Sequence, residues 1–361
     1  MGFFAVAGLI LLIMQIVIGI WFYFSFPSLG WKIPSLLVPF SLTLLMLFTL
    51  SYTRSHYGFW EKIAYYLAYT WAGLVFIFFF IILAFILLQA LCALFHWQSK
   101  TFITYSSMAT LSVVMVLSML GGIKPPVIKH VEISMPHAPQ MKIAVLSDAH
   151  LGVGVSVDRF KKALNKISQE NPDAVFVLGD LFEYGPHRQQ YAQALADLKT
   201  KYGTFGVLGN HEYYVGLEKS LEFYKQANIH LLDNKIHLLP NGLEIIGVND
   251  ILTSRVQASQ LENLLKNSHP DRARVLLSHQ PLLTHVAAAY QIPLMLSGHT
   301  HNGQIFPFNF FVKLRYKYIY GRYNLSDKSQ LYVTSGMFYW GMPLRFLTTA
   351  EIPLLHIKNH D

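Results

Sequence analysis

The feature that most constrains this chain is the near absence of charge from its first third. Between Met1 and Gly121 there are four lysines or arginines and one glutamate, whereas the remainder holds 24 basic and 19 acidic residues. Of all 361 residues, 53% are hydrophobic and 13% are charged, and that charged fraction is about half the value usual for soluble domains. The first third is therefore predicted to lie in a membrane, with a change of class near residue 122.

Four segments of this region are apolar enough to form membrane helices, because crossing the hydrocarbon core takes about 20 helical residues. They run approximately from Phe3 to Phe24, Leu36 to Tyr52, Ile63 to Phe95 and Phe102 to Gly121. The fourth carries six serines and threonines and is the least apolar. We predict a bundle of about four spans over residues 1–121, and whether the fourth segment crosses stays open.

The basic residues near the span ends predict an orientation, because cytoplasmic loops carry an excess of lysine and arginine. With four spans, the side of both termini receives Arg54, Lys62, Lys124 and Lys129, and the other side receives Lys32 and Lys100. We therefore expect a multi-pass protein of the inner (cytoplasmic) membrane with its C-terminal domain in the cytoplasm. The net charge of +8 suits membrane lipids or a phosphate-bearing substrate. Nucleic acid is not expected, since no basic repeat or zinc finger is present.

The rest of the chain has the sequence pattern of an α/β domain. Residues 122–140 contain four prolines and are predicted to be a linker to a domain at 141–361. Strands are expected at Lys142–Ser147, Ala174–Leu178, Thr204–Leu208, Leu243–Val248, Arg274–Ser278 and Pro293–Ser297. Amphipathic helices are expected at Val157–Glu170, Gln189–Lys201, Leu217–Gln226 and Ser259–Lys266. Strands that alternate with helices indicate a layered α/β fold.

Polar residues directly follow five of these strands. They are Asp148 with His150, Asp180, Asn210 with His211, His279, and His299 with His301. One such cluster is typical of an ordinary turn, but five can converge, because ligand sites of α/β sheets lie at the carboxyl ends of strands. Imidazoles and carboxylates bind manganese, iron and zinc. Two such ions about 3.5 to 4 Å apart activate water and neutralise a phosphoryl group during in-line displacement.

The chain from Lys142 to about Ile357 resembles the calcineurin-like metallophosphoesterase family. The resemblance lies in five motifs in a fixed order, namely D-x-H, G-D, G-N-H, a single H and G-H-x-H. The resemblance implies an α/β sandwich of two sheets flanked by helices. It implies that Asp148, His150 and His301 hold one metal, that Asn210, His279 and His299 hold the second, and that Asp180 bridges them. His211 would be the catalytic residue that contacts the phosphate and stabilises or protonates the leaving oxygen. Asn302 and Gly303 replace the family's frequent Gly-Gly before Gln304, which bears on substrate preference.

The segment Ile305–Tyr323 interleaves aromatic with basic residues directly after the last motif. It has two interpretations, a β-hairpin in the core or a lipid-facing platform, because aromatic rings suit the acyl boundary and basic groups suit phosphates. In the second, Met337, Phe338, Tyr339 and Trp340 extend the platform. The candidate substrate-binding residues are Phe308, Phe310, Phe311, Arg315, Arg322 and Arg345.

A catalytic domain anchored by several spans is best explained by a substrate that is itself in the bilayer. The architecture is similar to that of the membrane-anchored UDP-2,3-diacylglucosamine pyrophosphatases of lipid A synthesis. This resemblance implies hydrolysis of the lipid-linked diphosphate to lipid X and UMP with two divalent ions, manganese first and iron or zinc as alternatives. A broader membrane phosphodiesterase or phospholipid hydrolase fits the same residues. A non-enzymatic scaffold fits less well, because such relatives have usually lost metal ligands and this chain keeps all seven.

Overall fold

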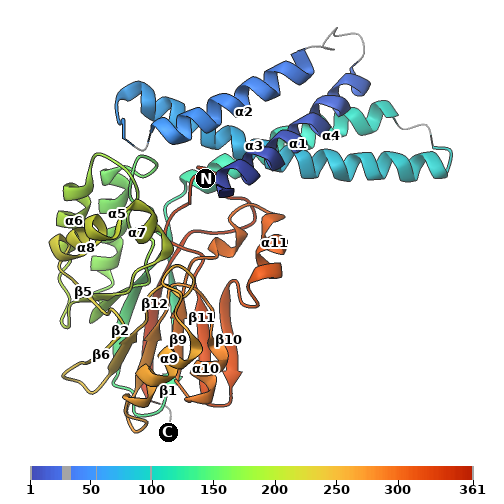
Figure 1. Cartoon of the computed structure of the whole chain (residues 1–361). Coiled ribbons are helices and arrows are strands. Elements are labelled where there is room, and N and C mark those ends of the chain that lie inside the picture. The colour runs from blue at the N-terminus through green and yellow to red at the C-terminus, as the bar shows by residue number, and fades with distance from the viewer. Residues whose placement is uncertain (1, 27–33, 54, 98–99, 360–361) are drawn as a thin grey trace. The chain divides into compact units, whose positions relative to one another are not determined.

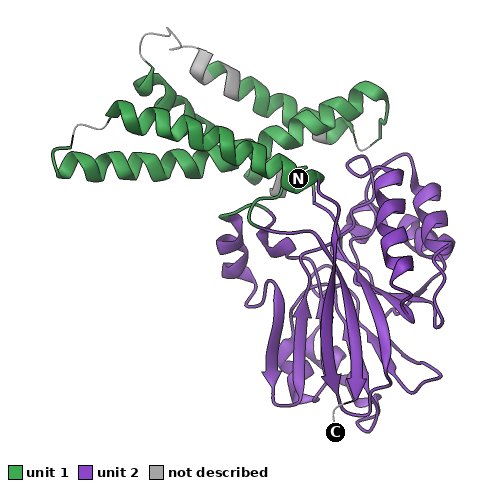
Figure 2. Cartoon of the chain, turned by 180° about the vertical axis from the view of Figure 1, so that it is seen from behind, with its two compact units in different colours: residues 1–123, 305–307, 341–347 green, residues 124–304, 308–340, 348–361 purple. Residues whose placement is uncertain are grey.

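The structure is a computed structural model that describes residues 2–26, 34–53, 55–97 and 100–359. The chain divides into two compact units (Figures 1 and 2). Unit 1 comprises residues 1–123, 305–307 and 341–347, and unit 2 comprises residues 124–304, 308–340 and 348–361. Lys32 and Arg54, which entered the prediction of orientation, lie outside the described residues.

Unit 1 is built on four helices at the positions expected from hydropathy. They are α1 (Gly2–Ser25), α2 (Pro34–Tyr52), α3 (Phe59–Leu94) and α4 (Lys100–Ile123). Within the described residues, three stretches are long and apolar enough to cross a membrane, namely Val6–Ser25, Phe59–Leu94 and Lys100–Ile123. The described apolar stretch of α2, Phe40–Thr49, is shorter. The fourth predicted segment, whose crossing the sequence did not decide, is thus among the three.

Several hydroxyl groups of α4 bond to the backbone of the helix itself. Ser107 donates to the Thr104 carbonyl at 2.7 Å, Thr110 to Ser106 at 2.9 Å and Ser118 to Val114 at 2.6 Å. A hydroxyl that bonds the preceding turn exposes little polarity to its surroundings. Large apolar side chains cover much of the surface of unit 1, including Leu67 at 66% exposed and Leu94 at 77% exposed. Exposed apolar area on this scale marks a membrane interaction surface.

Two short segments from the last sixth of the chain complete unit 1. Ile305 and Phe346 form an isolated parallel bridge, and the backbone nitrogen of Arg345 donates to the Ser118 carbonyl of α4 at 3.0 Å. A Cβ atom at Gly122 would collide with the carbonyl of Pro343, so the close approach requires glycine there. Nothing in the hydropathy pattern predicted that these residues join the helices.

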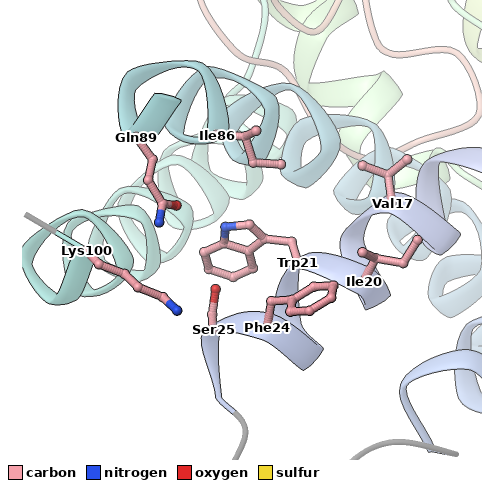
Figure 3. Close-up of a pocket in the computed structure, with 8 residues that line it drawn as sticks. All are labelled: Val17, Ile20, Trp21, Phe24, Ser25, Ile86, Gln89 and Lys100. Atoms are coloured by element: carbon pink, nitrogen blue, oxygen red, sulfur yellow. The ribbon is translucent and has the colours of Figure 1, made fainter. Parts of the chain in front are cut away.

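A pocket of about 390 Å³ lies among α1, α3 and α4. Its wall is mainly apolar, with Trp21, Phe24 and Ile86 among the lining residues. The side chains of Gln89 and Lys100 point into the same space (Figure 3).

Unit 2 contains two six-stranded mixed sheets (Figure 1). The first has the order β1 (Val127–Met135), β12 (Glu351–Asn359), β2 (Met141–Leu146), β3 (Ala174–Val177), β4 (Thr204–Gly206) and β5 (Ile229–Leu231). The second has the order β10 (Gly321–Ser326), β11 (Ser329–Val333), β9 (Leu294–Ser297), β8 (Arg274–Leu277), β7 (Glu244–Gly247) and β6 (Lys235–Leu238). From β2 to β5 and from β7 to β9, neighbouring strands run parallel.

Three apolar layers hold the sheets and helices together. Along β2, Ile143 and Val145 enter a core that also contains β8 and β9 residues, while Ala144 and Leu146 enter a second core on the other face. That second core is covered by α5 (Val157–Gln169), α6 (Arg188–Ala196) and α8 (Leu217–Gln226). A third core packs α9 (Ala258–Lys266) and α10 (Thr284–Ala289) on the second sheet. Because alternate side chains are buried on both faces, the central strands are apolar throughout.

Two stretches differ from their predicted form. The stretch 122–140, expected to be a linker, contains β1, which pairs in parallel with β12 over nine residues. The hairpin interpretation of Ile305–Tyr323 is wrong, because Phe308–Arg315 is a helix, α11, in which no residue is buried. Only from Gly321 does this part of the chain become a strand.

Candidate metal centre

All seven predicted ligand residues lie at the carboxyl ends of strands or in the turns that follow them. Asp148 follows β2, Asp180 follows β3, and Asn210 begins the short helix α7 (Asn210–Val215) after β4. His279 follows β8 and His299 follows β9 of the second sheet, and His301 begins the 3-10 turn η2 (His301–Gly303). The two sheets thus contribute to one cluster.

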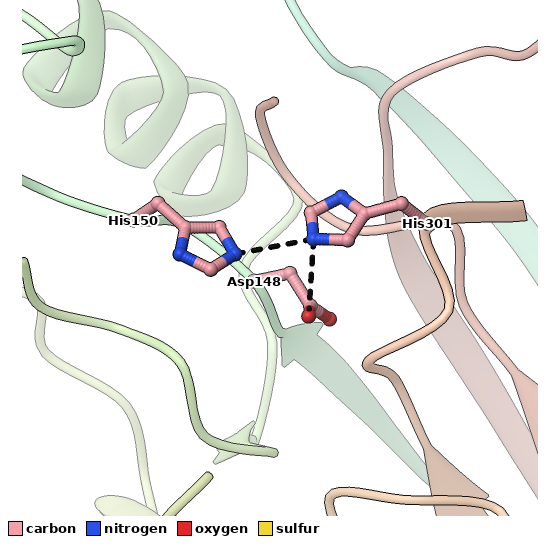
Figure 4. Close-up of side chains that lie close together, drawn as sticks. All are labelled: Asp148, His150 and His301. Atoms are coloured by element: carbon pink, nitrogen blue, oxygen red, sulfur yellow. Dashed lines mark hydrogen bonds and ion pairs between the residues drawn. The ribbon is translucent and has the colours of Figure 1, made fainter. Parts of the chain in front are cut away.

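The first group consists of Asp148, His150 and His301, all buried (Figure 4). The Nε2 atoms of the two histidines are 3.1 Å apart, and His301 Nε2 lies 3.4 Å from Asp148 Oδ1. Asp148 is oriented by the backbone nitrogen of His299, which donates to its two carboxylate oxygens at 3.1 and 3.0 Å. Three potential ligand atoms therefore face one small volume.

The second group consists of Asp180, His279, His299 and Asn210. His279 Nε2 lies 3.1 Å from Asn210 Oδ1, 3.1 Å from His299 Nδ1 and 3.2 Å from Asp180 Oδ2. The same Asp180 oxygen is 4.0 Å from His150 Nε2 of the first group. Asp180 is thus within reach of both groups, the position that a bridging ligand requires.

Most of these ligand residues have an uncommon backbone conformation. The φ angles of Asp148, His150, Asp180, His299 and His301 are 54°, 43°, 50°, 69° and 48°. Non-glycine residues seldom adopt the left-handed region, and such strain concentrates at functional sites. The sharp turns aim side chains from different strands at one point.

Glycines in the motifs allow the ligand loops to touch. A Cβ atom at Gly179, where φ is 91°, would collide with the backbone of Gly209. A Cβ atom at Gly298 would collide with Ser147 Oγ and with the Asp148 carboxylate. The glycines of G-D, G-N-H and G-H-x-H are therefore needed for close packing of loops, beyond their ordinary use in turns.

Fixed acceptors hold the outward nitrogens of two ligand histidines. His150 Nδ1 lies 2.8 Å from Glu183 Oε1, and His279 Nδ1 lies 2.8 Å from the Leu178 carbonyl. Because a carbonyl oxygen can only accept, His279 must donate from Nδ1, and in the neutral imidazole its lone pair is then on Nε2. That lone pair faces the Asn210 and Asp180 oxygens, which are acceptors too. A divalent cation satisfies such a set of converging lone pairs, so the residues fit a metal centre.

The electrostatics of the cluster agree with a site for cations. Burial lowers the pKa of His279, but the carboxylates of Asp180 and Asp148 outweigh burial and raise the pKa to about 10. Without a cation His279 Nε2 therefore holds a proton, which a bound metal ion would displace. Burial alone would raise the pKa of Asp180, but His279 and His211 hold it well below its ordinary value. The pocket therefore concentrates negative charge away from water, where it interacts strongly with positive charge.

His211 lies beside the cluster rather than within either group. Its Nδ1 is 2.5 Å from Glu183 Oε1, and its Nε2 is 4.0 Å from Asp180 Oδ2. Burial lowers the pKa of His211, but Glu183 and Asp180 together raise it to about 9. These two carboxylates therefore favour the protonated imidazole.

Sequence reasoning missed two glutamates of this centre. Glu183 contacts both His150 and His211, as described above. Glu212, which is fully buried, accepts from the backbone nitrogens of Gly209 at 2.7 Å, Asp180 at 2.9 Å and Leu181 at 2.7 Å. It ties the loop after β3 to the loop after β4. A local signal existed for Glu212, since a glutamate at the third helical position is typical of a capping box.

The candidate substrate-binding residues are distributed over both units. Phe308, Phe310 and Phe311 of α11 are 46%, 56% and 46% exposed, and Arg315 ends this helix. Arg322 donates from Nη1 to the Glu132 carbonyl of β1 at 3.1 Å. Arg345 is a buried residue of unit 1.

The proposed extension of the lipid-facing platform is corrected by burial. Met337, Phe338 and Tyr339 are 0%, 0% and 4% exposed, and the first two belong to the core beneath α5 and α6. Only Trp340 is partly exposed, and its ring centroid lies 5.7 Å from that of His211. The sequence alone does not show whether a run of four apolar residues is exposed or buried, because the residues that pack against it are not known.

Comparison with known proteins gives a consistent family. A family model described as calcineurin-like phosphoesterase matches residues 141–303. An uncharacterized metallophosphoesterase of Campylobacter jejuni is 34% identical over 313 residues, which cover 81% of this chain and 83% of that protein. A bovine protein described as a transmembrane protein with metallophosphoesterase domain is 32% identical over 268 residues, which cover 68% of this chain and 60% of the bovine one.

Among solved structures, the fold is similar to that of a dimetal phosphatase from Danio rerio. The likeness covers 55% of this chain and 88% of the fish protein, at 14% sequence identity and a TM-score of 0.37.

Proposed function

Because this chain belongs to the calcineurin-like phosphoesterase family, and is a metal-dependent hydrolase with membrane-type helices, we propose that it hydrolyses a lipid-linked phosphate ester or diphosphate at the bilayer. The observation that carries the proposal is the exposed aromatic face of α11. Phe308 and Phe311 stack at a centroid distance of 6.1 Å, Leu314 is 86% exposed, and Lys313 and Arg315 occupy the last turn. Apolar rings beside basic groups suit the boundary between acyl chains and phosphates.

The position of α11 in the chain supports the same proposal. The residues just before it, Ile305–Pro307, belong to unit 1 together with the apolar helices, and η2 with His301 precedes them by one residue. The chain thus passes from a ligand turn through a segment of the membrane unit into the exposed helix. A substrate held in a bilayer would need contacts of both kinds.

The roles of the site residues follow from their placement. Asp148, His150 and His301 would hold one divalent ion and Asn210, His279 and His299 the other, with Asp180 shared. When bound, such a pair supplies an activated water and neutralises the phosphoryl oxygens. His211, whose Nδ1 contacts Glu183, would donate a proton from Nε2 to the leaving oxygen. We take manganese as the first metal to test, with iron and zinc as alternatives.

UDP-2,3-diacylglucosamine is the named candidate substrate, which would give lipid X and UMP. Purified full-length protein in detergent with Mn²⁺ and this lipid is expected to release UMP, measured by chromatography. The matched control is the Asp180→Asn protein under identical conditions. If no UMP is released but the protein releases a headgroup from one of a panel of phospholipids, the protein would instead be a broader phospholipid hydrolase.

A variant of α11 tests the lipid-facing surface. With Phe308, Phe310 and Phe311 changed to alanine, we expect kcat/KM to fall about tenfold or more on a lipid substrate in vesicles, since interfacial affinity scales with buried apolar area. Turnover of bis-p-nitrophenyl phosphate, a small soluble diester, should change less than about twofold. Leu217→Ala with Leu221→Ala serves as control, because these side chains are 39% and 40% exposed on α8. Equal losses on both substrates would reject the surface.

The cellular location is part of the proposal. Lys62, Lys124 and Lys129 lie on the side that carries the catalytic domain if all four helices cross, and this supports a cytoplasmic catalytic face in the inner membrane. Because α2 is the shortest apolar helix, the side depends on whether α2 crosses. The test is a cysteine introduced at the exposed Ser326 and treated with a membrane-impermeant maleimide in intact cells. Labelling of this cysteine would show that the catalytic domain lies on the side opposite to the cytoplasm.

A further inference from the structure

The outer ring nitrogen of His299 has a hydroxyl as partner, whereas those of His150 and His279 face a carboxylate and a carbonyl. His299 Nδ1 faces the metal centre, 3.1 Å from His279 Nε2. Its Nε2 lies 2.8 Å from the hydroxyl of Tyr316. A tyrosine hydroxyl can donate or accept. The direction of this bond therefore decides which nitrogen of His299 carries the proton.

A buried chain of hydrogen bonds beyond Tyr316 sets that direction. Asp250 Oδ1 accepts from Gln280 Nε2 at 2.8 Å, and Asp250 Oδ2 accepts from the backbone nitrogen of Thr253 at 2.9 Å. Since a carboxylate can only accept, the Gln280 amide must turn its nitrogen to Asp250 and its oxygen to Tyr316. The Tyr316 hydroxyl donates to that oxygen at 3.4 Å. Asp250, Gln280 and Tyr316 are 0%, 1% and 8% exposed, so water does not compete freely.

We infer that Asp250, Gln280 and Tyr316 form a positioning relay that holds His299 in the tautomer with its lone pair on Nδ1, facing the metal. Because Tyr316 gives its proton to Gln280, its oxygen accepts from Nε2–H of His299. Ligand histidines whose second nitrogen is held in this way bind metal more tightly, and loss of the holding group typically weakens binding about 10- to 100-fold. None of the three relay residues is itself a ligand.

The relay also explains features that the sequence left without a role. Asp250 lies two residues beyond the strand expected at Leu243–Val248, and its carboxylate is fully buried with no basic side chain bonded to it among the described contacts. Tyr316 directly follows α11, and its backbone nitrogen donates to Val312 of that helix at 2.8 Å. The segment with the exposed aromatic residues therefore also orients one metal ligand.

Reversing the Gln280 amide would change the position of the proton on His299, although Asp250 does not contact His299. If the Gln280 amide turned around, its nitrogen would face Tyr316, and the Tyr316 hydroxyl would have to donate to His299 Nε2. The proton of a neutral His299 would then be on Nδ1 and would point at the metal position. Asp250→Asn removes the constraint without changing volume, because an asparagine can meet either face of the Gln280 amide.

The test is a titration of the metal-free full-length protein with Mn²⁺ by calorimetry in detergent. For Tyr316→Phe we expect one of the two binding events to lose about 10- to 100-fold in affinity, with the melting temperature of the metal-free protein unchanged. The matched control is Tyr318→Phe, whose ring packs on Tyr323 at 4.8 Å and which removes a hydroxyl two positions away. Wild-type affinity in the control is expected.

Asp250→Asn provides the second measurement and decides the case if Tyr316→Phe does not fold. It is expected to weaken the same event several-fold, although no relay bond of Asp250 touches a ligand. Unchanged Mn²⁺ affinity in a folded Tyr316→Phe protein overturns the relay, and so does unchanged affinity in Asp250→Asn. Losses in melting temperature without losses in affinity would assign these residues a structural role only. These readouts concern metal binding, so they stand or fall separately from the lipid substrate.

Discussion

Asp180→Ala is expected to lose turnover almost completely, with kcat/KM falling on the order of 10³-fold or more, because two ions supply several kcal/mol and each 1.36 kcal/mol is worth a factor of about ten. The physical reason is that one carboxylate oxygen serves both ligand groups, at 3.2 Å from His279 Nε2 and 4.0 Å from His150 Nε2. Removing it weakens both sites at once, whereas loss of a terminal ligand weakens one.

Metal analysis makes this prediction specific to the bridge. After dialysis against a low Mn²⁺ concentration, the wild-type protein should retain two ions per chain and the Asp180→Ala protein fewer than one. Asp197→Ala is the matched control, since Asp197 is an exposed carboxylate bonded to Gln193 on α6. Circular dichroism establishes that each variant is folded, and Asp180→Asn repeats the measurement with the side-chain volume kept. A folded Asp180→Ala protein that retains two ions would remove Asp180 from the centre.

Local sequence pattern could predict some strands and helices of unit 2. In these elements the pattern of apolar and polar residues is contained within a few residues of sequence. The strand expected at Ala174–Leu178 is Ala174–Val177, and the helix expected at Leu217–Gln226 has those bounds. The candidate ligand residues could be selected for the same reason, because each lies just after a predicted strand. The rule that the carboxyl ends of parallel strands meet brings the candidates of each sheet together, whereas the meeting of the two sheets was expected only from the family resemblance.

The parts that could not be predicted depend on partners far away in sequence. β1 pairs with β12 more than 200 residues later, with Lys129 opposite Pro353, and proline inside an apolar run argues against a strand. Glu183 has no motif of its own, and its role appears only when the loops bearing His150 and His211 meet. Tyr316 reaches His299 from a different element altogether.

The helix α11 shows a signal that was present and misread. Phe308, Phe311 and Leu314 recur at intervals of three, which is typical of one helix face, and Pro307 precedes the first of them. The interleaving of aromatic with basic residues resembles strand alternation over the same stretch. Exposure decides between the two, because a strand in the core would bury half of these side chains and α11 buries none.

His211→Gln is expected to keep both metal ions and to lower kcat by about 10² to 10⁴, the usual range for a lost general acid. His211 Nδ1 lies 2.5 Å from Glu183, which contributes to raising the pKa of His211 to about 9. A group whose pKa is raised above its ordinary value holds its proton at neutral pH and loses it as the pH approaches 9. The variant glutamine fills the space but carries no transferable proton.

The dependence on leaving group separates proton donation from simple phosphate binding. A diester with an alkyl alcohol as leaving group needs its oxygen protonated, whereas p-nitrophenolate leaves without help. The loss in His211→Gln should therefore be at least about tenfold greater for the alkyl substrate, since general acid catalysis follows the basicity of the group protonated. His187→Gln, at an exposed position before α6, is the matched control. Equal losses on the two substrates would leave His211 a binding residue, and loss of an ion from the variant would make it a ligand.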